Sequence, residues 1–319
     1  MTWLSTGIPI GTPSAKVIVP VSRRTSKRSA SALLESAAAA NRTDPSFMHT
    51  VSEKSTNSWL EKRLMGAESA LELLGGVSVF AGEAIRESVR RPFEFTEILR
   101  QVFEIGWRSA PLILLSGLAV GSVLSMHTRS TLERFGAESM IPTALAFALV
   151  KETGPLVTGL LVSGRVGAGI GAELGGMRVT EQIDALESLA VNSFHYLAVT
   201  RIIACVIGLP LLTVLMNFSG LLGSYFAESI VSATSFSLYF TRAFSSMDFS
   251  DYVPPTLKTM VFGFIIGTTS SYLGYNATGG AEGVGRASTQ SVVLSSIFLI
   301  VINVILVKFI AFLFPVGGA

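Results

Sequence analysis

Residues 291–314 read SVVLSSIFLIVINVILVKFIAFLF, an apolar run in which Lys308 is the only charged side chain. A helix needs about 20 residues of this kind to cross the hydrocarbon core of a bilayer. Comparable runs occupy residues 110–126, 140–164, 196–226 and 256–275. Because helices satisfy all their backbone polar groups internally, the sequence predicts an all-α integral membrane protein with about five transmembrane helices.

The composition supports lipid as the solvent of this chain and excludes several classes of protein. Only 14% of the 319 residues are charged, against roughly 25% in soluble domains. The single cysteine, Cys205, excludes an intrachain disulfide and a cysteine-based metal site. The net charge is +2, without a basic stripe among aromatics, so nucleic-acid binding is not expected. The spans hold no Ser/His, di-Asp or metal constellation, which argues against an enzyme, and no cofactor is expected.

The N-terminal part differs in composition from the apolar body. Residues 1–58 are rich in Ser, Ala, Thr, Arg and Lys and lack an apolar period, which predicts a disordered basic tail. No acid precedes Glu35, so a transit peptide is the alternative. Residues 59–108 predict amphipathic, interfacial helices, with apolar stripes at Leu71, Leu74, Val77, Ala81, Ile85 and Val89 and at Phe95, Ile98, Val102 and Ile105.

Glycines and prolines predict how the spans pack and where they begin, and basic residues predict their orientation in the membrane. Gly117 with Gly121, and Gly263 with Gly267, are pairs that allow helices to approach closely. The pair Pro254–Pro255 predicts a helix start. Most loop bases after residue 60 fall on the side of the N-terminus, which predicts the N-terminus inside and the C-terminus outside. The outer segment 229–253 is rich in Phe and Tyr and predicts short interfacial helices, whereas Arg201 is expected in water at the inner end of the third span.

The stretch 151–190, KETGPLVTGLLVSGRVGAGIGAELGGMRVTEQIDALESLA, carries the candidate functional residues. Glu152 lies near the middle of the second span, beside Lys151 and before Pro155, which is expected to kink the helix. A carboxylate at that depth must face protein or a wet cavity. Adjacent residues diverge on a helix, so the partner of Glu152 is expected on another helix. Glu152 either locks a dimer through an ion pair or lines a lipid cavity.

The end of this stretch predicts an amphipathic helix between two spans. Val179, Ile183, Leu186 and Ala190 recur at helical spacing, while Glu181 and Asp184 lie on other faces. Such a helix packs on its own protein or docks into a groove of a separate ATPase. The sequence has no Gly-Lys-Ser/Thr motif, so a P-loop for ATP is excluded.

Several short motifs together resemble the MlaE permease family, which includes the chloroplast trigalactosyldiacylglycerol permease. They are Glu152-x-Gly154-Pro155, Gly164-Arg165-Val166-Gly167, Ala172-Glu173-Leu174-Gly175-x-Met177, Glu181-Gln182-Ile183-Asp184-Ala185-Leu186 and the block 278–289, TGGAEGVGRAST. The likeness covers about residues 65–315 and assigns residues 109–319 to a transmembrane permease domain.

The resemblance implies the membrane subunit of an ATP-binding-cassette (ABC) transporter that moves phospholipid between the inner and outer membranes and maintains outer-membrane asymmetry. It implies a homodimer, a separate ATPase subunit that uses the ATP, an MCE-domain periplasmic partner and, in some systems, a STAS-domain protein. The bacterial inner membrane is the expected location, with the chloroplast inner envelope as the alternative. An ion-driven secondary transporter and another ABC import permease are the competing functions.

The resemblance and the residues together define three groups of candidate positions. Lys151, Glu152 and Pro155 are candidates for the lipid path. The candidates for coupling to the ATPase are Arg165, Glu173, Glu181, Gln182 and Asp184. A Gly-rich cytoplasmic loop holds Gly279, Gly280, Gly283 and Gly285, as a plain flexible connection or as a compact turn in which Arg286 is free to meet Glu173.

Overall fold

The computed structural model describes residues 71–88, 94–232 and 234–313, and these residues form helices joined by short turns. Residues 71–88 form one helix, and the α-helices that follow are α3 (Phe95–Leu132), α4 (Ile141–Ala148), α5 (Gly154–Val162), α6 (Ala168–Val179), α7 (Gln182–Ser188), α8 (Thr200–Ser232), α9 (Phe236–Phe244), α10 (Phe249–Tyr275) and α11 (Gly280–Leu313). Short 3₁₀ turns η1 (Glu133–Phe135) and η2 (Glu138–Met140) follow α3. The π-helical segments η3 (Leu149–Thr153), η4 (Ser163–Gly167) and η5 (Phe194–Val199) continue into their neighbouring helices.

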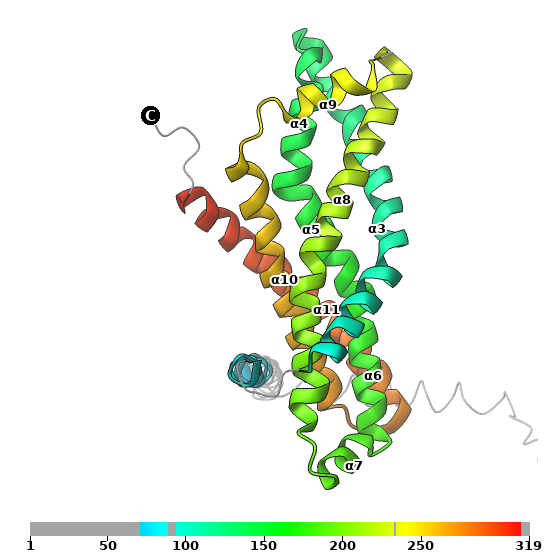
Figure 1. Cartoon of the computed structure of the whole chain (residues 1–319), viewed down its shortest axis with the longest axis vertical. Helices are drawn as coiled ribbons and strands as arrows, with labels where there is room; N and C mark the ends of the chain where they lie inside the picture. Colours follow the sequence, from blue (N-terminus) through cyan, green and yellow to red (C-terminus); the bar gives the residue numbers. More distant parts are fainter. Residues whose placement is uncertain (1–70, 89–93, 233, 314–319) are drawn as a thin grey trace, which may run out of the picture. The chain divides into compact units, whose positions relative to one another are not determined.

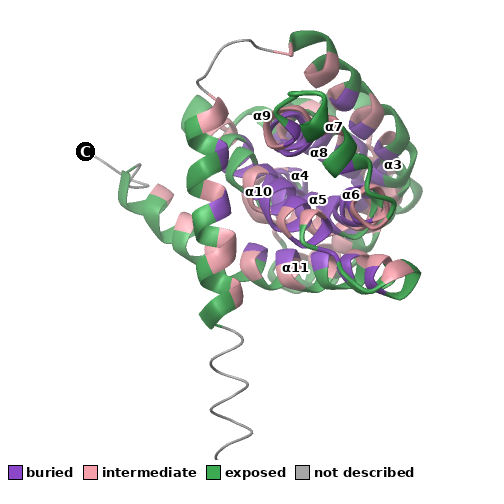
Figure 2. Ribbon diagram, turned by 90° about the horizontal axis from the view of Figure 1, so that it is seen from below, coloured by how far each residue is buried: buried purple, intermediate pink, exposed green. Residues whose placement is uncertain are grey.

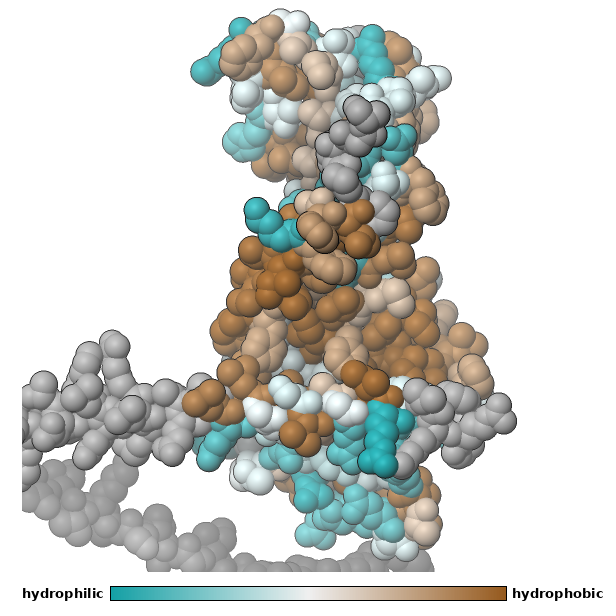
Figure 3. Space-filling model, turned by 90° about the vertical axis from the view of Figure 1, so that its left-hand side faces the viewer, coloured by the Kyte–Doolittle hydropathy of each residue, from teal (hydrophilic) through white to brown (hydrophobic). Residues whose placement is uncertain are grey.

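The chain runs back and forth along the helix bundle (Figure 1). It runs along α3, returns through α4, α5 and α6, and then runs along α8, α10 and α11 in alternating directions. The short helix α7 lies at one end and α9 at the other. On the face drawn in Figure 3, apolar side chains form a broad zone, and hydrophilic side chains gather toward the end that holds α7.

Four helices in the described part of the chain are long and apolar enough to cross a membrane, judged by length and composition. They cover 95–135, 138–179, 194–232 and 280–313. The remaining expected span lies in α10, whose buried residues include Thr268, Thr269, Ser270 and Ser271. Because α8, α6 and α11 surround α10, these hydroxyls face protein rather than lipid. The all-helical fold agrees with the sequence-based expectation, and about five spans fit it.

Close helix contacts organise the core, as the glycine pairs predicted. A methyl group added at Gly121 would stand 1.8 Å from the carbonyl oxygen of Gly220 on α8. One added at Gly263 would stand 2.4 Å from the carbonyl oxygen of Cys205. Helix α8 therefore packs tightly against both α3 and α10, and Figure 2 shows buried residues gathered where these central helices meet.

Helix α3 differs from the expectation in being continuous from Phe95 to Leu132. Its buried residues recur every four positions and begin with Gln101, Ile105 and Ser109. Gln101, which lies outside the expected apolar stripe, is therefore buried, whereas Phe95 of that stripe is 73% exposed. The interfacial stripe and the first span are parts of one helix, because nothing between them ends the helical hydrogen bonding.

Two further expectations need correction. Helix α10 begins at Phe249, before Pro254 and Pro255, because Asp248 caps it in a reciprocal capping box with Asp251. Arg201 does not project into water: its side chain is 5% exposed and donates to the carbonyl of Leu197 at 2.7 Å. Of the short helices expected within 229–253, one is present as α9, whose Tyr239 is fully buried and lies with its hydroxyl oxygen 2.7 Å from that of Ser224.

The helix of residues 71–88 packs on the bundle through Phe80 and Ala84. The ring of Phe80 makes edge contacts with Phe194 and Tyr272, at centroid distances of 4.9 and 5.7 Å. Leu71, Leu74 and Ile85 of the expected stripe are exposed, so the packed face is a neighbouring one. The expected disordered tail 1–58, and the part of the amphipathic segment before residue 71, lie outside the described residues.

Candidate functional site

Glu152 forms an ion pair with Lys258, which lies on α10. The Nζ atom of Lys258 lies 2.9 Å from Oε2 of Glu152, and Asn303 on α11 donates its amide to Oε1. The Lys258 side chain is 2% exposed and that of Glu152 is 43% exposed. Three helical passes therefore meet at one carboxylate, and the carboxylate keeps an accessible side.

The local backbone explains why this pair forms. Pro155 has no N–H, and its ring disfavours a helical bond to the carbonyl of Lys151 four residues earlier. That carbonyl accepts a hydrogen bond from Lys258 Nζ at 2.9 Å instead. The π-helical turn η3 spans the same residues. One ammonium group thus binds both the carboxylate of Glu152 and the backbone oxygen that the proline leaves free.

Lys151 points away from Glu152, as expected for adjacent residues on a helix. Its Nζ atom lies 2.7 Å from Oδ1 of Asp251 and 4.8 Å from the centre of the Phe147 ring. The candidate lipid-path residues therefore belong to two separate ion pairs, and both connect the second pass to α10.

An apolar groove lies beside the Glu152–Lys258 pair. Its volume is about 360 Å³, and Lys258 is the only charged residue that lines it among the described residues. Helices α10 and α11 supply the lining: Phe249, Ser250, Val253, Pro254, Leu257, Lys258, Leu306, Phe309, Ile310 and Leu313. The groove can hold hydrocarbon next to a charged group.

The candidate coupling residues divide into an exposed group at α7 and a group in η4 and α6. Glu181, Gln182 and Asp184 are exposed at α7, where Asp184 pairs with Arg178 at 2.5 Å, while Ile183 is fully buried. Helix α7 is shorter than expected: Val179 ends α6, and Glu181 and Ala190 have positive φ angles of 59° that bound α7. The polar tip is therefore a single short helix anchored by one apolar side chain.

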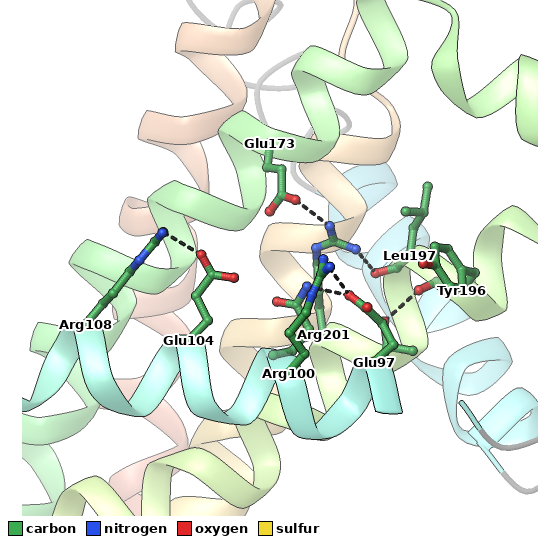
Figure 4. A network of polar contacts seen from close by, with 10 residues as sticks. Glu97, Arg100, Glu104, Arg108, Glu173, Tyr196, Leu197 and Arg201 are labelled. Carbon is green, nitrogen blue, oxygen red and sulfur yellow. Dashed lines mark hydrogen bonds and ion pairs between the residues drawn. The ribbon is translucent and has the colours of Figure 1, made fainter. Parts of the chain in front are cut away.

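Arg165 and Glu173 instead direct their polar atoms toward partners on other helices, although the Glu173 side chain is itself 54% exposed. Arg165 donates to the hydroxyl of Ser109 on α3 at 2.6 Å. Glu173 pairs with Arg201 at 2.7 Å, as Figure 4 shows. Glu173 does not meet Arg286, which pairs with Glu282 on its own helix.

A hydrogen-bond network joins α7 to the end of α10. Oε1 of Glu187 accepts from Ser193 Oγ at 2.6 Å and from Tyr275 Oη at 3.0 Å. These two hydrogen bonds lower the pKa of Glu187 below its ordinary value. The network therefore connects α7 to the helix that carries Lys258.

The Gly-rich connection is a tight turn. Gly279 and Gly280 have φ angles of +94° and +67°, which glycine adopts readily. Gly283 and Gly285 lie inside α11, which begins at Gly280, so the loop is shorter than expected. A methyl group at Gly283 would stand 1.9 Å from the carbonyl oxygen of Thr278. The first turn of α11 is therefore packed on the preceding turn rather than loosely connected.

Sequence reasoning missed Lys258 and Asn303. Lys258 lies near the start of the predicted span 256–275 and Asn303 in the most apolar run, and neither was singled out from the sequence. Both were findable, because a polar side chain inside a predicted span marks either a partner or a pathway. What the sequence does not contain is the geometry that brings residues 152, 258 and 303 together.

A bundle of helices long and apolar enough to cross a membrane, with an ion pair beside an apolar groove and a polar helix at one end, fits a membrane permease. A family model described as Permease MlaE matches residues 98–309. The chain belongs to the MlaE permease family, a family of transporter permeases rather than enzymes, and it is an ABC transporter permease.

Proteins similar in sequence to this chain are known from bacteria and from a plant. A probable ABC transporter permease protein of Rickettsia bellii is 39% identical over 235 residues, which cover 74% of this chain and 91% of the relative. Protein TRIGALACTOSYLDIACYLGLYCEROL 1, chloroplastic, of Arabidopsis thaliana is 31% identical over 73% of this chain and 67% of its own length. A probable ABC transporter permease protein of Synechocystis is 34% identical over 64% of this chain and 78% of its own length.

Proposed function

We propose that this protein is the permease of an ABC transporter that moves phospholipid between an inner and an outer membrane and maintains outer-membrane lipid asymmetry. The observation that carries the proposal is the Glu152–Lys258 pair beside the apolar groove of α10 and α11. A phospholipid combines a charged headgroup with hydrocarbon chains. The ion pair suits the headgroup, and the apolar groove suits the chains.

The proposal includes partner proteins. A membership in a family of ABC permeases implies a separate ATPase, and α7 offers it an exposed polar helix with Glu181, Gln182 and Asp184. We further propose a homodimer, supported by the exposed apolar side chains along α11, such as Ile297, Val301 and Val304. An MCE-domain protein facing the periplasm and a STAS-domain protein complete the proposed assembly.

The proposed location is the bacterial inner membrane, with the chloroplast inner envelope as the alternative. The relatives include bacterial proteins and one whose name places it in the chloroplast. Localising the tagged full-length chain by membrane fractionation of its native cells distinguishes the two.

Transport by the complex of permease and ATPase, reconstituted in proteoliposomes, tests the role of Glu152. The variants are Glu152→Gln, Lys258→Met and the double variant, and Glu138→Gln is the control because Glu138 is exposed and far along the same pass. Glu152→Gln leaves the buried Lys258 ammonium without its counter-charge, and Lys258→Met removes the counter-charge of the partly exposed Glu152, so both should lose stability and phospholipid transfer.

The double variant separates a functional role from a structural one. It removes both charges and should regain thermal stability, because an apolar replacement of a buried pair is tolerated. Under the proposal, its phospholipid transfer stays low. Recovery of transfer together with stability would show that the pair serves only to hold the helices. Transfer that continues without ATP would favour the ion-driven alternative.

A further inference from the structure

Arg165 differs from every other charged residue of its membrane pass. Along residues 138–179, Glu138, Lys151, Glu152, Glu173 and Arg178 each have an oppositely charged partner within 4.0 Å. Among the described residues Arg165 has no carboxylate partner, and its hydrogen bond goes to the neutral hydroxyl of Ser109. A guanidinium carries five N–H donors, so most of the hydrogen-bonding capacity of Arg165 is left for a ligand.

The free donors of Arg165 adjoin a polar groove of about 370 Å³. Helices α3 and α6 and the segment η4 line it with Gln101, Glu104, Ile105, Arg108, Arg165, Val166, Gly169, Ile170 and Glu173. Arg108 is neutralised by Glu104 at 2.5 Å, and Glu173 by Arg201 at 2.7 Å (Figure 4). One positive charge therefore remains, which is the charge needed to bind a monoanion.

The position of the groove indicates where that anion comes from. The adjoining half of α3 exposes Phe95, Leu99, Phe103 and Trp107, four residues apart along one face. The rings of Phe103 and Trp107 stack at a centroid distance of 6.3 Å. Exposed aromatic side chains of this kind gather at the level of lipid headgroups. Helix α7, where a soluble partner is proposed to bind, lies beyond this level at the end of the bundle (Figure 1).

We propose that Arg165 and Arg108 bind the phosphodiester of a phospholipid headgroup in the leaflet on the α7 side. Arg165 supplies the unpaired charge, and Arg108 supplies further donors from α3. Arginine suits this role because its planar fork matches the oxygens of a phosphate. The site is separate from Glu152, since 13 residues of helix place the two about 20 Å apart. It adds a second lipid contact to the proposed function and does not depend on transport.

Native mass spectrometry of the purified full-length protein, delipidated and then titrated with single lipids, tests the proposal. Phosphatidylethanolamine and phosphatidylglycerol should bind, whereas diacylglycerol, which lacks the phosphate, should not bind at this site. Arg165→Gln should weaken binding about tenfold, the loss expected for one charge-assisted hydrogen bond. Arg165→Lys should retain part of the affinity. Arg286→Gln is the matched control, because Arg286 is exposed and pairs only on its own helix.

Further variants distinguish lipid binding at Arg165 from lipid binding at Glu152 and from binding of a partner protein. Glu152→Gln should remove a different bound lipid, so the losses in the Arg165→Gln/Glu152→Gln double variant should add. Arg108→Gln tests the site without touching the bond between Arg165 and Ser109, and it should also weaken binding. Equal lipid binding in wild type, Arg165→Gln and Arg108→Gln overturns the proposal. So does equal competition by inorganic phosphate alone, which would assign the site to a free anion. A loss confined to copurification of the ATPase would make the groove a protein-docking surface and would likewise overturn it.

Discussion

Gly121 and Gly117 on α3 leave no room for a side chain. A methyl group at Gly117 would stand 1.8 Å from the hydroxyl oxygen of Ser219, and one at Gly121 would meet the backbone of Gly220. Ser122 strengthens the same contact by donating to the carbonyl of Gly223 at 2.9 Å. The spacing of the two glycines predicted a close helix contact from the sequence. It did not predict that α8 makes this contact, because every predicted span has an apolar surface that could pack there.

Gly121→Ala should therefore destabilise the protein, by about 1–3 kcal/mol for overpacking a tight contact. Thermal unfolding in detergent, followed by circular dichroism, measures this loss. Gly106→Ala on the same helix is the control, since nothing lies within 4 Å of the added methyl group. It should leave the stability unchanged or raise it, because alanine favours helix. Equal melting temperatures for both variants would contradict a tight α3–α8 contact.

Helix α7 shows how far sequence periodicity predicts an element. The spacing correctly predicted a helix with the exposed Asp184 and the buried Ile183, whereas the exposed Glu181 lies just before the first residue of α7. It did not predict that Glu187 joins Tyr275, which lies 88 positions later in the chain. The exposure pattern of α7 depends on the local spacing of residues. The contact between Glu187 and Tyr275 depends on how α7 and the end of α10 come together in space.

The Glu187 network should weaken in acid. Its hydrogen bonds lower the pKa of Glu187 below the ordinary 4.5, so their stabilisation is present above that pH and is lost as the pH falls through the lowered pKa. Near pH 7, Glu187→Gln should speed hydrogen exchange of residues 182–188 relative to wild type. The ratio of the two rates, taken at each pH, should approach one in acid. A ratio that does not change with pH would show that the carboxylate charge does not hold α7.

Reversing the charges of Glu181 and Asp184 to lysine should loosen the ATPase. The Asp184–Arg178 pair is exposed, and such pairs contribute only about 0–1 kcal/mol, so folding should survive. Copurification of the ATPase with the permease is the measurement. Glu83→Lys, at an exposed position in the helix of residues 71–88, is the control. Undiminished ATPase recovery would exclude these two residues from the contact.

At the scale of the whole described bundle, the helical passes follow from apolar run lengths, but the positions of the charged side chains within them do not. Arg201 was expected in water at the end of its span and Lys258 was not singled out, yet both are buried beside a carboxylate. Burial of a charge depends on a partner from another pass. The order and direction of the passes are thus predictable from one sequence, whereas the polar interior that distinguishes a permease from a plain bundle is not.

Because α7 and α9 lie at opposite ends of the bundle (Figure 1), we expect them on opposite sides of the membrane. Ser188→Cys and Ser245→Cys, each in a Cys205→Ala background, should react with an impermeant thiol reagent from opposite faces of intact cells or vesicles. Both positions are exposed, so accessibility does not limit the reaction. The Cys205→Ala parent should stay unlabelled. Labelling of both positions from one face would contradict the five-pass topology.

The π-helical segments η3, η4 and η5 have a consequence for how this chain tolerates change. Each acts as a one-residue insertion, which rotates the helix beyond it by about 100° relative to a regular α-helix. Loss of a single codon inside η3 would restore a regular helix, yet it would turn the carboxylate of Glu152 away from Lys258 or turn α5 and α6 away from their neighbours. We therefore expect in-frame deletions in these three segments to be selected against more strongly than most substitutions there.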